Sequence, residues 1–222
     1  MKFKQLLRVA ARLAGLFVVL VMAYEAYAVW RAENRTATVL SEALSQPQSI
    51  NLAQLTPRQK EILLKVEDPG FYDHKGIDLR SPGQGMTTIT QGLVKFLYFE
   101  NFKPGFAKIE QSLIARFVLN RHLPKDQQLT LVLNQAYFGH RDGKAVRGFA
   151  DASRAYFGKP FEILNEEEYI GLIGMLIGPN KFRPDTYPQA HSERVGRIKR
   201  LLAGKCRPAG VFDPWYRNCA GA

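Results

Sequence analysis

The amino-acid sequence predicts a mainly α-helical protein that carries one N-terminal transmembrane helix. Three observations support this fold class. Residues 13–30 form one apolar run, apolar residues recur at helical spacing through most of the later chain, and the alternating patterns typical of strands are few. The 222 residues, 46% of them hydrophobic and 23% charged, suffice for one globular domain and exclude wholesale disorder. Two cysteines exclude a disulfide-dense scaffold and a cysteine-rich zinc module.

The first thirty residues predict a membrane anchor. Residues 13–30 read LAGLFVVLVMAYEAYAVW, and these eighteen residues reach about 27 Å as a helix, close to the roughly 30 Å hydrocarbon core of a bilayer. Four bases and no acid precede this run, namely Lys2, Lys4, Arg8 and Arg12. This asymmetry predicts a single-pass protein of the cytoplasmic membrane, with residues 1–12 inside and the domain on the periplasmic or extracellular side. Two alternatives stay open: a removable signal peptide, because Ala26-Tyr27-Ala28 resembles a cleavage site, and a buried core helix.

The formal net charge of +11 is compatible with two kinds of anionic partner. A basic domain held beside a bilayer meets membrane lipid headgroups and phosphate-bearing substrates. Nucleic acid is a poor candidate partner outside the cytoplasm. Because a surface excess of charge also serves solubility, the charge permits these interpretations without selecting one.

The chain after the anchor divides into three parts. Residues 31–49 are polar and predict a linker or a short stalk helix, residues 50–204 a helical domain, and residues 205–222 a C-terminal tail. A Thr56-Pro57 helix start and a Pro69-Gly70 stop bound the first helix of the domain. The further helices predicted from apolar spacing cover 88–99, 108–121, a segment including 129–136, 146–156, 166–177 and 191–202.

The two cysteines of the tail, Cys206 and Cys219, lie 13 residues apart. In an oxidising compartment they predict a structural disulfide. Closing this loop would stabilise the folded state by about 3 kcal/mol, because it lowers the conformational entropy of the unfolded chain. The alternative is two free thiols.

The densest polar cluster of the sequence is Glu67–Asp78, at the end of the first domain helix. A carboxylate at a helix end beside aromatic residues is a candidate general base, because burial raises the pKa of such a group. A metal site formed by Asp73, His74 and Asp78 is one alternative, and a structural His74 that hydrogen-bonds the loop backbone is another.

A second polar cluster follows a glycine- and proline-rich loop. Gly85 precedes hydroxyl side chains at Thr87 and Thr88, and Lys95 follows one to two helical turns later. Hydroxyls and a cation near a helix N-terminus suit an oxyanion or a phosphate. The plainer alternative is that the threonine only caps the helix.

These segments resemble, in order, the motifs of glycosyltransferase family 51, the peptidoglycan glycosyltransferases. The resemblance spreads over residues 67–184. Residues 67–78 resemble ED-x-x-F-x-x-H-x-G-x-D, residues 87–95 resemble S-T-I-T-Q-Q-L-x-K, residues 133–139 resemble L-N-x-x-Y-F-G, residues 148–159 resemble G-x-x-x-A-A-x-x-Y-F-G-K, and residues 164–184 match the fifth segment without a gap.

The resemblance implies a lysozyme-like helical domain that polymerises lipid II, a disaccharide-peptide on undecaprenyl pyrophosphate, into β-1,4 glycan. Glu67 would be the general base on the acceptor hydroxyl. The partners implied are lipid II, the nascent glycan and membrane lipids, with other cell-wall synthesis proteins as further candidates. No cofactor is implied, and a divalent cation is not indicated. The substrate-binding residues implied are Asp68, Phe71, His74, Thr87, Thr88, Gln91, Lys95, Lys108, Ser112 and Asn134.

One departure from the family pattern concerns a second acid. The family has a Glu 13 residues before the Lys of a Ser-Lys pair, and counting back from Lys125 reaches Ser112. Glu110 lies two positions away, which is about 200° around a helix. Three outcomes stay open: Glu67 suffices, the lipid-linked substrate differs, or the protein binds precursor or synthesis partners without turnover. A glycan-cleaving enzyme is a further alternative, because lysozyme-like folds also host hydrolases.

Overall fold

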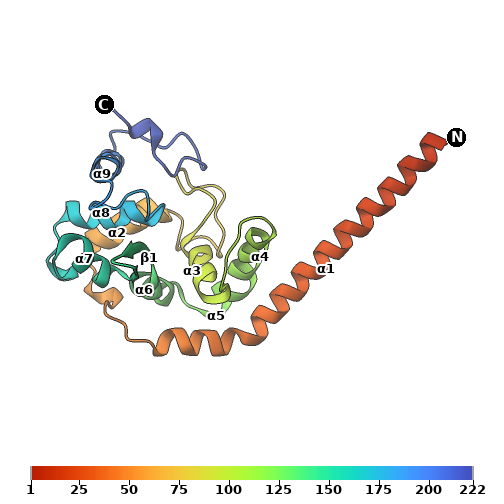
Figure 1. Ribbon diagram of the computed structural model, residues 1–222, viewed down its shortest axis with the longest axis horizontal. Helices are drawn as coiled ribbons and strands as arrows, with labels where there is room; N and C mark the ends of the chain where they lie inside the picture. Colours follow the sequence, from red (N-terminus) through yellow and green to blue (C-terminus); the bar gives the residue numbers. More distant parts are fainter. Residues whose placement is uncertain (1, 222) are drawn as a thin grey trace.

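The N-terminal helix α1 (Lys2–Ser45) is one continuous helix in the computed structural model, which describes residues 2–221. Figure 1 shows its N-terminal half projecting away from the other helices. The side chains of residues 3–20 are exposed, and α1 is long and apolar enough to cross a bilayer. The polar segment from residue 31 to residue 45 continues the same helix. Of the two predictions for this segment, a linker or a stalk helix, it is therefore a stalk helix.

The stalk half of α1 is bound to the domain by polar contacts. Arg35 Nη2 donates to the carbonyl of Tyr98 at 2.6 Å, and the Thr36 hydroxyl lies 2.9 Å from the Tyr98 hydroxyl. His122 Nε2 lies 2.7 Å from Glu33 Oε1. These contacts fix the orientation of the stalk half relative to the domain.

Two capping boxes begin helices where the sequence predicts them. Thr56 caps α2 (Pro57–Glu67) together with Gln59. Thr88 caps α3 (Ile89–Tyr98) together with Gln91. In each box the threonine hydroxyl accepts from the third backbone N–H of the helix, and the glutamine side chain accepts from the backbone N–H of the threonine. The remaining elements are η1 (Leu52–Gln54), α4 (Phe106–Ile114), η2 (Ala115–Leu119), α5 (Asn120–His122), α6 (Lys125–Gln135), β1 (Tyr137–Arg141), β2 (Lys144–Arg147), α7 (Phe149–Phe157), η3 (Phe161–Ile163), α8 (Glu166–Leu176), α9 (Pro188–Leu202) and η4 (Arg217–Cys219).

The structure corrects two of the predicted helices. The helix expected over 146–156 begins only at Phe149, because residues 137–147 form the antiparallel hairpin β1–β2. Its turn is Asp142-Gly143, with φ values of 51° and 76°, the backbone that a tight right-twisted hairpin needs. The helix expected over 108–121 contains a π-helical turn, Ala115–Leu119, which inserts one extra residue and rotates the register of α4 relative to α5.

The core surrounds α8, which is apolar on nearly all sides and whose residues from Tyr169 to Met175 are all buried. Phe149 packs between Phe138 and Phe161, with ring centroids 5.0 and 6.2 Å away. These aromatic contacts connect the hairpin and α7 to the core. Because α8 also packs against α2, the core supports the helix that ends at Glu67.

The C-terminal tail is folded against the domain. A disulfide joins Cys206 and Cys219, whose Cα atoms are 5.5 Å apart, which confirms the predicted pairing. The N–H groups of Gly83 and Gly85 donate to the carbonyls of Gly210 and Val211 at 2.9 and 2.7 Å. In Figure 1 the tail therefore lies beside the loop that precedes α3.

We expect Gly148→Ala to destabilise the fold more than Gly143→Ala. Both glycines have a positive φ, 77° and 76°, and Gly148, whose ψ is 154°, lies in a backbone region that is essentially restricted to glycine, so alanine is strained at both positions and more so at Gly148. A Cβ at Gly148 would also lie 2.7 Å from the carbonyl oxygen of Asn134, whereas a Cβ at Gly143 meets nothing within 4 Å. Thermal unfolding followed by circular dichroism measures the difference. Equal midpoints for the two variants would contradict a close approach of the Asn134 backbone to Gly148.

Candidate active site

A cleft of about 300 Å³ opens between α2 and α3. Apolar residues of α2, α3, α6 and α8 form its floor, among them Val66, Leu93 and Leu176. The polar side chains that line it are those of Glu67, Gln84, Thr87, Thr88, Lys95, Tyr137 and Arg194. An apolar cleft with few convergent polar groups is the usual form of a small-molecule or substrate site.

Glu67 is the last residue of α2 and its side chain enters this cleft. The residue is half-buried, and its carboxylate accepts no hydrogen bond from any residue between 2 and 221. Loss of solvation raises the pKa of Glu67 to about 7, against the opposing charge of Arg194, while the neighbouring Asp68 adds to the increase. A carboxylate with such a pKa and free oxygens can accept a proton near neutral pH.

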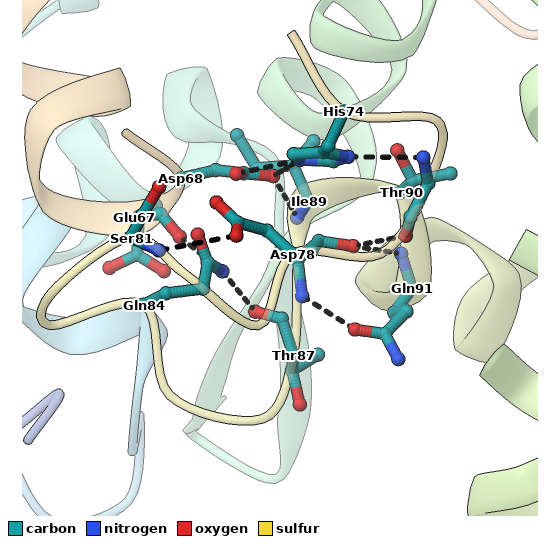
Figure 2. Close-up of polar contacts among 12 residues, drawn as sticks. Glu67, Asp68, His74, Asp78, Ser81, Gln84, Thr87, Ile89, Thr90 and Gln91 are labelled. Atoms are coloured by element: carbon teal, nitrogen blue, oxygen red, sulfur yellow. Dashed lines mark hydrogen bonds and ion pairs between the residues drawn. The ribbon is translucent and has the colours of Figure 1, made fainter. Parts of the chain in front are cut away.

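The adjacent carboxylate, that of Asp68, is satisfied instead. It is fully buried, its Oδ2 accepts from the backbone N–H of Ile89 at 2.9 Å, and its two oxygens lie 2.9 and 3.1 Å from His74 Nε2. His74 Nδ1 accepts from the N–H of Gly76 at 3.0 Å, so Nε2 carries the proton that is donated to Asp68. Figure 2 shows this network beside Glu67. Asp68 and His74 therefore position the end of α2 against the start of α3.

The metal-site alternative for this loop has no support in the geometry. Both ring nitrogens of His74 are used, and Asp78 Oδ1 accepts from the N–H groups of Arg80 and Ser81 at 2.7 and 3.2 Å. Asp73 is exposed. Across residues 2–221 no group of three His, Cys, Asp or Glu side chains is placed to hold a metal ion. His74 instead has the structural role that was the other alternative, since it hydrogen-bonds the backbone of the loop.

Thr87 and Lys95 line the α3 side of the cleft, and Lys108 does not line it but binds Thr87; these three residues form a cationic rim. Lys108 Nζ donates to Thr87 Oγ1 at 2.8 Å, and Lys95 lines the cleft about two turns into α3. Burial, with repulsion from Lys95, lowers the pKa of Lys108 to about 8. Two cations that repel each other favour an anionic group between them.

The side chains of α4 supply no second acid to the cleft. Ser112 Oγ accepts from Gln91 Nε2 at 2.8 Å and so faces α3, while Gln111 Nε2 donates to the Gln91 carbonyl at 2.6 Å. Gln91 and Ser112 bind each other and do not line the cleft. Glu110 is buried on another side, where its Oε1 lies 3.6 Å from Arg31 of α1. Within the described residues, α4 contributes no carboxylate to the cleft.

Two further residues that the sequence predicts to bind substrate do not line the cleft and make contacts within the fold. Asn134 does not line the cleft: its amide donates to the Ile50 carbonyl at 2.7 Å and its oxygen accepts from the Ile50 N–H at 3.0 Å. Phe71 is buried beneath the ammonium of Lys125, which lies 4.3 Å from the ring centroid. Both side chains therefore have structural roles outside the cleft.

Sequence reasoning missed three polar residues that line the cleft, namely Gln84, Tyr137 and Arg194. Gln84 Nε2 donates to the carbonyls of Glu67 and Thr87 at 3.3 and 3.0 Å, which joins the two polar clusters. Arg194 of α9 is 2% exposed. A signal for Arg194 existed, because it shares a helical face with the buried Ile198 and Leu201, where a charged residue is unusual.

The sequence is similar to known proteins over most of the domain. A family model described as "Transglycosylase" matches residues 33–203. Penicillin-binding protein 1B of Buchnera aphidicola is 37% identical over 153 residues, 63% of this chain and 20% of that protein. Penicillin-binding protein 1B of Escherichia coli is 34% identical over 64% of this chain, which is 18% of that protein. Penicillin-binding protein 1F of Bacillus subtilis is 33% identical over 71% of this chain, which is 23% of that protein. The chain thus spans about a fifth of the length of these curated relatives.

We expect Asp68→Ala to destabilise the folded state by about 3 kcal/mol, because the buried Ile89 N–H and the His74 N–H both lose their acceptor. Asp73→Ala is the matched control, since this exposed acid of the same loop should change stability by no more than about 0.5 kcal/mol. Denaturant unfolding measures both. Two equal changes would show that the Asp68 network does not hold the site together.

Proposed function

The chain belongs to the transglycosylase family, glycosyltransferase family 51, and we propose that it is a membrane-anchored peptidoglycan glycosyltransferase that polymerises lipid II. The observation that carries the proposal is the carboxylate of Glu67, half-buried in an apolar cleft without a hydrogen-bond partner among the described residues, with a pKa raised by burial to about 7. The family's motifs supply the substrate class.

In the proposed reaction Glu67 accepts the proton of the acceptor sugar's 4-hydroxyl. That oxygen then attacks C1 of the donor sugar, a C–O bond forms, and the bond from C1 to the pyrophosphate oxygen breaks. The configuration at C1 inverts, and undecaprenyl pyrophosphate leaves with the bonding electrons. A base with a pKa close to the operating pH suits this proton transfer.

The cationic rim fits the leaving group of this reaction. Negative charge develops on the pyrophosphate as the bond to C1 breaks. Lys95 lines the cleft beside Thr87, and Lys108 binds the Thr87 hydroxyl. Fixed cations that face a developing charge stabilise a transition state more than they stabilise the ground state. We assign these lysines to the pyrophosphate.

The anchor would bring the cleft to its substrate. Apolar side chains of α1 such as Leu13 and Phe17 are 61% and 59% exposed, as expected for a helix that meets lipid. Because Arg35 and Thr36 bind Tyr98 at the end of α3, the cationic rim would stay near the membrane surface. The topology proposed has the N-terminus inside and the domain outside.

One observation favours a second candidate function. No carboxylate of α4 reaches the cleft within the described residues, since Glu110 faces Arg31 and Ser112 faces Gln91. A family member without this second carboxylate would bind lipid-linked precursor without turnover, or act through cell-wall synthesis partners. This alternative predicts saturable lipid II binding by the purified protein and no glycan under conditions in which an active family member makes it.

We expect Glu67→Gln to lower the rate of glycan formation from labelled lipid II by roughly 10²- to 10⁴-fold, because the amide cannot accept the proton. Glu61→Gln, an exposed position on the same helix, is the control and should keep the rate of the native protein. Polymerisation by the full chain in detergent is followed by gel separation of the glycan. Native activity in Glu67→Gln would remove this residue from the reaction.

The pH dependence of kcat/KM should follow the ionisation of Glu67. Only the ionised carboxylate is a base, so the rate should fall about tenfold for each pH unit below a midpoint near 7, where the cleft places the pKa of Glu67. The measurement is the initial rate of glycan formation between about pH 5 and about pH 9, which brackets that midpoint. A rate that stays flat down to about pH 5 would contradict a base with a raised pKa.

A further inference from the structure

Three arginines of α9 bind the backbone of the C-terminal tail. Arg194 Nη1 donates to the Pro214 carbonyl at 2.8 Å, Arg197 Nη1 to the Trp215 carbonyl at 3.5 Å, and Arg200 Nε to the Cys219 carbonyl at 2.6 Å. The spacing of three residues puts these side chains along one side of the helix. The tail is therefore bound to α9 through its main chain.

The same tail segment is bound to the catalytic side of the domain. The Tyr216 hydroxyl donates to the Val66 carbonyl at 2.5 Å, one residue before Glu67, and Tyr216 is buried. The Cys206–Cys219 disulfide closes the segment, and Pro214 lines the cleft. This segment follows the residues that the family model matches, which end at residue 203. It is thus a feature of this chain beyond the matched domain.

Arg194 is the member of this arginine series that enters the cleft. Its guanidinium is buried, lies 4.7 Å from the Tyr216 ring centroid, and lines the same cavity as Glu67 without an ion pair to it within residues 2–221. The charged groups that act electrostatically on Glu67 are Arg194 from α9 and Asp68 beside it at the end of α2. Of these Arg194 alone favours the ionised carboxylate.

We propose that Arg194, held in the cleft wall by the disulfide-closed tail, is a positioning residue that keeps Glu67 in its ionised, proton-accepting form. The proposal deepens the proposed function and rests on it. Its geometric basis is a buried cation that two groups of the tail fix in place, the Pro214 carbonyl and the Tyr216 ring. Without that cation, burial and the neighbouring Asp68 oppose the ionisation of Glu67 unbalanced by Arg194.

The test is the titration of Glu67 in the full chain in detergent, read by pH-difference infrared spectroscopy. The protonated-carboxyl band of Glu67 is identified by its loss in Glu67→Gln. Because a nearby opposite charge lowers a carboxyl pKa by about 1–3 units, Arg194→Gln should move the midpoint upward by about one unit. Arg194→Lys, which keeps the charge, should restore most of the native midpoint, and a Cys206→Ser/Cys219→Ser double variant should move it in the same direction as Arg194→Gln.

Arg197→Gln is the matched control, because Arg197 binds the tail carbonyl next to that of Arg194 but does not line the cleft. It should leave the midpoint unchanged. An unmoved midpoint in Arg194→Gln, or equal shifts in Arg194→Gln and Arg197→Gln, would overturn the proposal. The same preparations are assayed with lipid II: absence of glycan from the native protein together with the expected titration shift would overturn the proposed function alone.

Discussion

Two neighbouring carboxylates at the end of α2 have opposite environments, and the candidate site depends on that difference. Asp68 is fully buried and hydrogen-bonded by His74 and by the first N–H of α3. Glu67, one residue earlier, enters the cleft with no partner among the described residues. The hydrogen bonds of Asp68 fix the backbone at the end of α2. They thereby hold the carboxyl of Glu67 in the cleft, where burial disfavours its ionised form. Environments that separate adjacent acids in this way are how proteins assign one of them to proton transfer.

The two ends of the chain complete the cleft from opposite sides. The stalk half of α1 holds α3 and α5 through Tyr98 and His122, which sets where the cationic rim lies relative to the candidate membrane span. The C-terminal tail holds α9 against the loop before α3 and adds Pro214 to the cleft wall. Both are contacts between segments far apart in the sequence. The position of the cleft walls is therefore set by contacts of both terminal segments as well as by the central helices.

Local signals in the sequence predicted much of this arrangement. The capping residues at Thr56 and Thr88 are short-range features, and both begin helices where expected. The hairpin was missed although Asp142-Gly143 is a strong turn signal, because its strands are short and lack clear alternation. The direction in which Glu110 points could not be predicted by counting residues back from Lys125, because the π-helical turn between the two residues changes the helical register. The position of Arg194 on the buried face of α9 left a signal in the sequence, but its role could not be predicted, because that role depends on a tail that folds back across the domain.

The most direct measurement of the central claim is the pH dependence of unfolding free energy in the native protein and in Glu67→Gln. A carboxyl whose pKa rises from 4.5 in the unfolded chain to about 7 in the fold binds its proton more tightly when folded, so the stability that it contributes is present at low pH and is lost as the pH rises through this window. The advantage of Glu67→Gln over the native protein should therefore grow between these two pH values and then stay constant. A difference between the two proteins that does not change with pH would contradict a desolvated carboxylate at position 67, and with it the proton-accepting role of this residue.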